Sequence, residues 1–532
     1  MPSFPSFFIS FCRKLGILGC LAFLISPLLT TFSCSHHNRL EGYVYYRLGT
    51  NPTTLDPALI VDVTGSSIAA KLFNGLVRLD EDLSVIPDLA ESWGVSSDGL
   101  SYRFKLNRDV KFANNQIVTS HDFKFSFKRI LDPKTRSPNT WVLEKIEGAK
   151  DYLQGKTDDV KGLKIIDDYT LEIRLEKPFS PFLYLLTMSA AYVVPESEVK
   201  RWGPDFSSHP VGTGPFMLKG WLPNRELRLE RHDSYFGKKP HIKGVIYRII
   251  SEDLTAMTEF ELGNLDMVAV PGSEFARYRN AEKWRDLMAS VKGINTYYLG
   301  MNCAKPPFNN ANIRRAMNIA IDRRKLLSTF YEDRGRVAAG PVPDLLRKWD
   351  TPDLYEYNPQ KAKDIVRQEG FAGTVIHFYI TADQEVVDMA EFIQSYVGKT
   401  GLKVKIHQLE WSAYKEAINR GEPDMFWLSW WADYPDPEDF LFPLFHSSNI
   451  GPAGNRTRYK NLEVDRLIEL GHAAGNEKER NSYYEKAEQL IVKDAPWVFF
   501  WHKNDYTLRQ PWIKGYRIYS IYSIDKGTEI SF

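Results

Sequence analysis

Four aromatic side chains surround a carboxylate in one short stretch of the chain. Trp427, Trp430, Trp431 and Tyr434 lie next to Asp433 in the sequence. A carboxylate binds an ammonium group through charge-assisted hydrogen bonds, and neighbouring indole faces add cation–π attraction. We therefore interpret this stretch as a receptor for an organic ammonium group.

The same stretch carries further acidic residues, which leave two other interpretations open. Carboxylate oxygens can bind a hard cation such as calcium, although the spacing fits no EF-hand loop. Prolines stiffen turns, so the acids can equally form a solvated surface turn. We predict no metal site and keep the ammonium receptor as the leading interpretation. The acids and the interrupting prolines are Asp433, Asp436, Glu438, Asp439, Pro435 and Pro437.

The motifs that mark common enzyme classes are absent from the sequence. It contains no GxSxG elbow, no P-loop, no HExxH and no paired CxxC. Two SxxK strings, at 197–200 and 412–415, lack the SDN element that accompanies this motif in serine acyl-transfer enzymes. We predict no catalytic residues and no cofactor. A hydrolase is a remote alternative, because it would need a nucleophile and a base held together.

Local patterns indicate the elements that position the acidic stretch. Residues 102–106 alternate apolar and charged side chains, which predicts a half-buried strand. Thr119 and Asp122 form a capping box at the start of a predicted amphipathic helix. Gly212 and Gly214 suit a tight turn or a ligand passing nearby, and we favour the turn.

The C-terminal half contains a predicted βαβ unit. Residues 374–381 and 402–407 have strand patterns, and residues 384–399 between them have a helical pattern. Two strands joined in this way should be parallel, with a right-handed crossover. A further amphipathic helix is predicted over 312–326. The fold class is therefore mixed α/β.

Length and charge limit the class of protein. A chain of 532 residues is too long for one hydrophobic core, so we expect two or three packed units. The 68 basic and 67 acidic residues leave a net charge of +1, which excludes a strong attraction to nucleic acid. Cys303 is the only cysteine in the body of the chain, so no intrachain disulfide is expected there.

The N-terminus has the pattern of an export signal. Arg13 and Lys14 precede an apolar run over 15–32, and Cys34 follows it. Cys34 resembles the acylated cysteine of bacterial lipoproteins, which predicts a signal peptide over 1–33 and a lipid anchor on Cys34. The alternative is an uncleaved signal anchor that spans the bilayer. Either arrangement places the body outside the cytoplasm.

Longer motifs carry a resemblance to a known family. Residues 89–129 read LAESWGVSSDGLSYRFKLNRDVKFANNQIVTSHDFKFSFKR, and this run closely resembles the signature of the bacterial extracellular solute-binding proteins, family 5. Members of that family bind substrates for oligopeptide and dipeptide ABC importers. Further matches span almost the entire mature chain: LDP at 55–57, PVGTGPF at 210–216, PPFNNANIRRAMNIAIDR at 306–323, YNPQKAK at 357–363 and WWADYPDP at 430–437.

The resemblance implies a fold and a division into domains. The expected fold is a two-lobed periplasmic-binding-protein clamshell of the large class II, or cluster C, type, with an extra domain on lobe one. Lobe one would comprise residues 40–72, 194–297 and 503–532. The extra domain would comprise 73–193, and lobe two 298–502. Ligand would be enclosed between the lobes, with a hinge near 297 and 502.

The resemblance also implies ligand contacts. By similarity to the oligopeptide binders, Asp433 would hold the α-ammonium group of a peptide, and Trp411 and Trp430 would wall a side-chain pocket. The segment from Asn51 to Thr53 would face the cleft. Further candidates for contact with the ligand are Trp431, Trp427, Tyr297 and Tyr298, although the two tyrosines can equally belong to a strand that alternates into the core.

One part of the family pattern is missing. In the oligopeptide binders, cationic residues reach the C-terminal carboxylate of the peptide, but the corresponding positions here are Glu385, Ile418 and Trp427. Arg420 lies close in sequence to one of these positions and is a candidate to compensate. The receptor for the carboxylate is therefore left open.

The expected function is that of an extracytoplasmic substrate-binding protein. It would capture peptides as a monomer and deliver them to the membrane permease of an ABC importer, without catalysing a reaction. Alternatives on the same scaffold are binding of modified cell-wall peptides, or of nickel or metallophore complexes. An extracytoplasmic hydrolase is the remote alternative.

Overall fold

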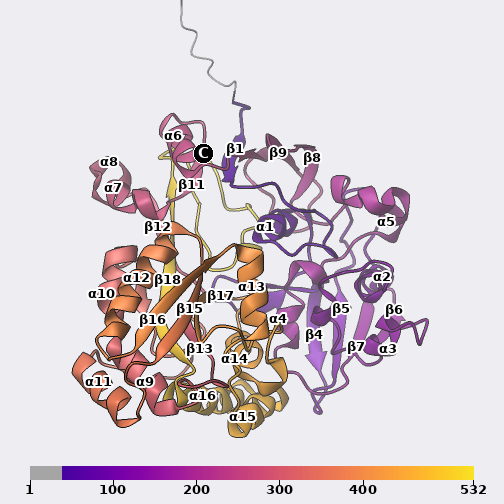
Figure 1. The fold of residues 1–532 in the computed structure, drawn as a ribbon. Helices are drawn as coiled ribbons and strands as arrows, with labels where there is room; N and C mark the ends of the chain where they lie inside the picture. The colour runs from indigo at the N-terminus through magenta and orange to yellow at the C-terminus, as the bar shows by residue number, and fades with distance from the viewer. Residues whose placement is uncertain (1–38) are drawn as a thin grey trace, which may run out of the picture. The chain divides into compact units, whose positions relative to one another are not determined.

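Twelve strands form one mixed sheet through the computed structural model of the protein, which describes residues 39–532 (Figure 1). Their order is β16-β15-β17-β13-β18-β11-β1-β10-β9-β8, and β12 and β14 also pair with β18. The strands are β1 (Tyr43–Leu48), β8 (Phe216–Leu222), β9 (Glu226–Arg231), β10 (Gly244–Ile249), β11 (Met267–Ala269), β12 (Met288–Lys292), β13 (Asn295–Met301), β14 (Gly335–Val337), β15 (Val375–Thr381), β16 (Lys403–Leu409), β17 (Met425–Trp431) and β18 (Trp497–Arg509).

Strand β18 belongs to both halves of this sheet. Its first residues pair with β13 and β14, as in Tyr298↔Phe499. Its last residues pair with β11 and β12, as in Ala289↔Thr507. Strand β18 is therefore one continuous strand of 13 residues that pairs with strands of both predicted lobes. The predicted limits of the lobes and of the extra domain stay predictions.

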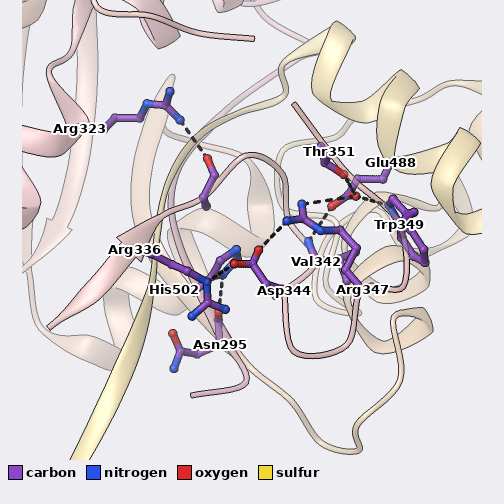
Figure 2. A network of polar contacts seen from close by, with 11 residues as sticks. Asn295, Arg323, Arg336, Val342, Asp344, Arg347, Trp349, Thr351, Glu488 and His502 are labelled. Atoms are coloured by element: carbon purple, nitrogen blue, oxygen red, sulfur yellow. Dashed lines mark hydrogen bonds and ion pairs between the residues drawn. The ribbon is translucent and has the colours of Figure 1, made fainter. Parts of the chain in front are cut away.

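A side-chain clamp joins β18 to the start of β13. The Asn295 carboxamide accepts a hydrogen bond from the Lys503 amide (2.7 Å) and donates one to the Lys503 carbonyl (3.0 Å). The His502 ring nitrogen Nδ1 lies 2.7 Å from the Asn295 carbonyl oxygen (Figure 2). Burial and the nearby Arg336 lower the pKa of His502 to about 4, so this imidazole is neutral at pH 7.

A chain of ion pairs continues from β14 toward helix α16 (Glu477–Asp494). Arg336 on β14 pairs with Asp344, and Arg347 also reaches Asp344 at 2.5 Å (Figure 2). Glu488 on α16 lies 4.0 Å from Arg347 and accepts hydrogen bonds from Trp349 and Thr351. Glu488 is buried and the other three charges are partly buried, and all have partners within the chain, which makes them structural rather than candidate ligand contacts.

The predicted βαβ unit is confirmed. Strands β15 and β16 are parallel, and helix α12 (Gln384–Gly398) connects them. The Asp383 side chain caps α12, and Ala390 and Ile393 on its predicted apolar face are buried. Helix α12 packs against β15 and β16, while α13 (Trp411–Arg420) contacts β15 (Figure 1).

The helix predicted over 312–326 is wrong in one respect, because the chain breaks it. Helix α9 (Ala311–Ala320) ends before Ile321, and α10 (Arg323–Tyr331) starts anew. The Asp322 side chain accepts a hydrogen bond from the Lys325 amide, so it acts as an N-cap for α10. Aspartate competes with helix continuation in this way.

A separate antiparallel sheet has the order β4-β5-β7-β6. In its strand β5 (Ser101–Leu106) buried and exposed side chains alternate as predicted. Helix α2 (Ser120–Leu131) begins at the predicted capping box, where the Thr119 amide donates to the Asp122 carboxylate at 2.8 Å. The other strands outside the large sheet are β2 (Val77–Leu79), β3 (Val85–Pro87), β4 (Ala90–Val95), β6 (Leu163–Asp167) and β7 (Thr170–Arg174).

The remaining α-helices surround these sheets (Figure 1). None of the helices within residues 39–532 combines the length and the apolar character needed to cross a membrane. The predicted export signal and Cys34 lie outside the described residues. The helices not yet named are α1 (Val63–Leu72), α3 (Ala149–Leu153), α4 (Phe182–Leu185), α5 (Glu196–Trp202), α6 (Asp253–Glu261), α7 (Phe275–Asn280), α8 (Glu282–Arg285), α11 (Pro359–Gln368), α14 (Glu438–Phe445) and α15 (Leu462–Ala473).

Gly212 and Gly214 have a role that differs from the favoured tight turn. Both pack directly on the C-terminal end of α1: a Cβ atom would lie 2.1 Å from the Leu72 carbonyl oxygen at Gly212, and 2.3 Å from that of Lys71 at Gly214. The Gly214 amide donates to the Leu72 carbonyl at 2.9 Å. Close approach of two backbones, rather than turn geometry, therefore requires glycine here.

This packing predicts a large effect of one methyl group. We expect Gly214→Ala to lower the free energy of unfolding by about 2 kcal/mol or more, because backbone atoms cannot yield as a side chain can. Urea denaturation followed by circular dichroism measures this. Gly220→Ala is the matched control, since a Cβ there meets nothing within 4 Å; an equal loss for both variants would contradict the packing argument.

Candidate functional site

The end of strand β17 brings an acid and an indole to the first turn of helix α14. The buried Asp439 carboxylate, on α14, accepts a hydrogen bond from the Asp433 amide at 2.9 Å. The same oxygen accepts a weaker bond from the Trp430 indole nitrogen at 3.4 Å. Asp439 thus fixes the turn after β17 and leaves the Asp433 side chain exposed to solvent.

A cavity of about 280 Å³ opens beside these residues. One wall comes from residues 141–185, in the predicted extra domain, and the other from residues 430–453, in predicted lobe two. Its lining combines acids with aromatic rings, which suits a ligand that carries both a charge and an apolar group. The aromatic and acidic residues that line it include Trp141, Phe179, Trp430, Asp433, Tyr434, Glu438, Asp439 and Phe442.

Asp433 and Asp439 are carboxyl groups without a cationic partner. Neither makes an ion pair with any residue of the 39–532 region. Protein atoms around the cavity partly desolvate Asp433 and raise its pKa to about 6. Burial, followed by the neighbouring charge of Asp433, raises the pKa of Asp439 well above its usual range. An incoming ammonium group would relieve both effects, because it supplies the missing opposite charge.

The other acids of the stretch have partners in the chain. Asp436 forms an ion pair with Arg480 at 2.9 Å. Glu438 pairs with His472 at 2.8 Å and accepts a hydrogen bond from the Tyr434 hydroxyl. Within the described part of the chain, no three His, Cys, Asp or Glu side chains are grouped so as to hold a metal ion. The acidic stretch is therefore divided into two paired acids and two unpaired ones.

Two tryptophans nominated from the sequence are open to solvent. Trp431, the last residue of β17, is 46% exposed, and Trp411 at the start of α13 is 52% exposed. The Lys415 ammonium group lies over the Trp411 ring at 5.2 Å. Both rings can therefore be reached by a ligand, as expected for residues that wall a cleft.

The side chains of Asn51 and Thr53 form hydrogen bonds with other residues of the protein. The Asn51 carboxamide bonds to the Asn224 side chain and accepts the Asn224 amide at 2.8 Å. The Thr53 hydroxyl donates to Asp62, the residue that caps α1. These contacts give both residues a role in shaping the entry to α1.

Tyr298 and Trp427 do not lie where a ligand could contact them. Tyr298 is buried and stacks on Trp497 with 3.5 Å between ring centroids. Trp427 is buried against Trp501. Side chains alternate along β13, so its preceding residue Tyr297 lies on the other face, where its ring is 6.5 Å from that of Trp431. Of the two tyrosines named from the sequence, Tyr297 is therefore the one on the side of Trp431.

Glu385 and Arg420 differ in their surroundings. Glu385 lies in the first turn of α12, and burial together with the nearby charge of Glu385 raises the pKa of Tyr331 well above its usual value. Arg420, in the last turn of α13, forms ion pairs with Glu416 and, at 2.7 Å, with Glu422. The candidate cation for a ligand carboxylate is thus already neutralised by acids on the surface.

Sequence reasoning missed the wall of the cavity that comes from residues 141–185. Trp141 and Phe179 line it, and the Trp141 ring lies 6.4 Å from that of Tyr434. Nothing in the local pattern of either residue distinguishes it from an ordinary core aromatic. Only the packing of distant segments brings them to the acids.

A second hollow, of about 430 Å³, contains none of the nominated residues. It lies between residues 78–88, 235–238 and the C-terminal segment 515–530. Charges at its edge are paired with each other, as in Arg517 with Glu81 and Lys238 with Glu529. The unpaired acids make the cavity beside Asp433 the better candidate.

The desolvation of Asp433 predicts a pH-dependent effect on stability. With a pKa near 6 in the folded chain and near 3.8 when unfolded, the ionised carboxylate destabilises the peptide-free fold increasingly from pH 4 to pH 6, and fully above that. Asp433→Asn should therefore raise the melting temperature more at pH 7.5 than at pH 4.5. Scanning fluorimetry measures both values. Asp286→Asn, at a side chain 84% exposed, controls for loss of a surface charge; equal shifts at the two pH values would contradict the assignment.

Comparisons with known proteins identify the family of the chain. The family model described as "Bacterial extracellular solute-binding proteins, family 5 Middle" matches residues 84–452. Heme-binding protein A of Haemophilus influenzae is 30% identical, over 87% of this chain and 88% of that protein. The periplasmic oligopeptide-binding protein OppA of Escherichia coli is 29% identical, over 88% of each.

A solved structure shares the fold over nearly the whole chain. The unliganded open form of the periplasmic murein tripeptide-binding protein MppA superposes with a TM-score of 0.81 at 25% identity, covering 92% of this chain and 97% of that one. The fold expected from the resemblance, a mixed α/β clamshell of two lobes, is confirmed. The chain belongs to the family 5 bacterial extracellular solute-binding proteins.

Proposed function

We propose that the protein captures peptides outside the cytoplasm and delivers them to the membrane permease of an ABC importer. The observation that carries this proposal is the pair Asp433 and Asp439, which form no ion pair within residues 39–532 and lie beside an indole in a cavity. An α-ammonium group is the ligand chemistry that this pair best receives. The relatives named for oligopeptide and murein tripeptide binding support the ligand class.

The mechanism is capture between two lobes. The peptide's leading ammonium group binds Asp433, and its main chain adds to exposed strand edges, which gives affinity without reading side-chain identity. Closure of the lobes removes water and strengthens these polar contacts. Ligand binding selects the closed state, which the permease then recognises. No step breaks or forms a covalent bond.

The anchor belongs to the same proposal. The export signal over 1–33 carries the chain across the membrane, and a lipid on Cys34 holds the monomer near its permease. A single tether leaves the lobes free to close. The location is extracytoplasmic, like that of the periplasmic relatives.

Other ligands remain alternatives on this scaffold. One relative is named for heme binding, so hemin is included in the test below. Modified cell-wall peptides also carry a free ammonium group and fit the same acid pair. For nickel, no group of three or more His, Cys, Asp or Glu side chains within residues 39–532 is placed to hold a metal ion.

The proposed function predicts which ligand co-purifies with the protein. The native protein is purified and denatured to release any bound ligand. Mass spectrometry of the released material should find peptides with free amino termini. Titration calorimetry with a varied peptide library should give saturable heat, and X-ray scattering should show a smaller radius of gyration with peptide. Saturable absorbance changes with hemin, and neither heat nor compaction with peptides, would overturn the proposal.

The ammonium contact predicts a selective loss. We expect Asp433→Asn to weaken binding of a free-amine peptide by about tenfold or more, since a hydrogen bond to a charged group contributes about 1.5–3 kcal/mol. The N-acetylated form of the same peptide should lose much less, because it presents no ammonium group. Calorimetry of both forms with both proteins measures this coupling. An equal loss for the two peptides would show that Asp433 does not hold the amino terminus.

A further inference from the structure

Two histidines meet at one edge of the large sheet. His377 lies on β15, and His407 lies on the neighbouring strand β16 at the end of the strand order (Figure 1). The His377 Nδ1 atom is 2.9 Å from the His407 Nε2 atom. Neither residue lines the two cavities described above. The proposed function therefore does not involve this pair.

The register of the two parallel strands places both rings on the same face. Tyr379 pairs with His407 across β15 and β16, and His377, two residues before Tyr379, shares that face. The other face of β15 carries Ile376 and Phe378, which are buried. His377 is exposed and His407 is half-buried. The pair therefore lies at the surface of the protein.

Neighbouring residues hold each histidine in place. The His377 amide donates to the Asp424 carboxylate at 2.8 Å, and the Asp424 amide donates to the His377 carbonyl at 3.1 Å. The Tyr379 ring lies against the His407 ring, with 4.8 Å between the centroids. Lys405 and Asp424 act on His407 with opposite charges. These two charges oppose each other, so neither dominates the electrostatics of the pair.

The short contact requires that at least one of the facing nitrogens carries no hydrogen. Two N–H groups cannot point at each other over 2.9 Å, so one nitrogen donates and the other accepts. The accepting ring is therefore neutral. In a neutral pair, the donated hydrogen can move through solvent to the outer nitrogen of its own ring. Both facing nitrogens then carry lone pairs, which is the form in which imidazole binds metals.

The separation of the two nitrogens fits chelation of one metal ion. With a metal–nitrogen bond of about 2.0–2.1 Å, as in zinc sites, two nitrogens bound at right angles lie about 2.9 Å apart. Right angles are the geometry of square-planar or tetragonal Cu(II) and Ni(II) sites. A tetrahedral Zn(II) site would need a separation of about 3.3 Å. The observed separation therefore matches the tetragonal ions best.

We propose that His377 and His407 form a surface site for a divalent late transition metal ion, with Cu(II) bound most tightly. Imidazole suits copper, nickel and zinc, and the affinity of such a site is highest for copper. No third His, Cys, Asp or Glu side chain within residues 39–532 completes a metal-binding group. Water would occupy the remaining positions around the ion.

This metal site is distant from the candidate cavity. Asp424, beside His377, precedes strand β17, whereas Asp433 follows the end of that strand. At about 3.3 Å per residue, the strand separates the two positions by about 20 Å. A metal ion between the histidines would not touch a ligand beside Asp433. The inference therefore stands independently of the proposed function.

Titration of the full chain with CuCl2 in a non-chelating buffer tests the inference. Calorimetry should show saturable Cu(II) binding, and electron paramagnetic resonance should show the ion coupled to two nitrogen nuclei. His377→Gln and His407→Gln should each weaken this binding about tenfold or more, because loss of even an outer-shell partner typically costs about 10–100-fold in metal affinity. His36 and His37 are present in every variant, so the comparison cancels their contribution.

His121→Gln is the matched control, because its side chain is 63% exposed and lies far from a second histidine in the sequence. It should leave Cu(II) binding unchanged. Unchanged affinity in both site variants, or an equal loss in His121→Gln, would overturn the inference. Absence of Cu(II) binding by the wild-type protein would do the same. If His407→Gln fails to fold by circular dichroism, His377→Gln alone decides, since that residue is exposed.

Discussion

The register of strand β18 is the constraint on which the arrangement of the large sheet depends. Its first part pairs with β13 and β14, and its last part with β11 and β12. A slip of one residue would turn Lys503 to the opposite face and bring Trp501 out of the core. The two hydrogen bonds between Asn295 and Lys503 fix this register where β13 and β18 lie side by side.

Charged side chains that are paired within the chain serve the fold, whereas unpaired ones are candidates for contact with a ligand. Several buried charges are paired internally, as Lys71 is with Asp525 and Asp436 with Arg480. Within residues 39–532, Asp433 and the buried Asp439 form no ion pair, and desolvation raises the pKa of both carboxyl groups. Because desolvation of an unpaired charge opposes folding, these positions are costly unless a ligand supplies the missing charge.

Local sequence patterns predicted local structure well where neighbouring residues decide it. Alternation along β5, the capping box before α2 and the parallel βαβ unit all follow from spacing alone. The break between α9 and α10 was missed, because apolar periodicity continues through Ile321 while the Asp322 side chain caps a new helix. The role of Gly214 was also missed, since its close contact is with Lys71, far away in the chain.

The family, the mixed α/β class and the nomination of an aspartate among indoles as a candidate receptor all followed from the amino-acid sequence. Folding in three dimensions pairs Asp436 and Glu438 with distant residues and leaves Asp433 and Asp439 without an ion pair within residues 39–532. It also decided which face of β13 is core, which removed Tyr298 from consideration. The physical reason is the same in each case: pairing and burial depend on residues that are distant in the chain, and short-range patterns carry no information about them.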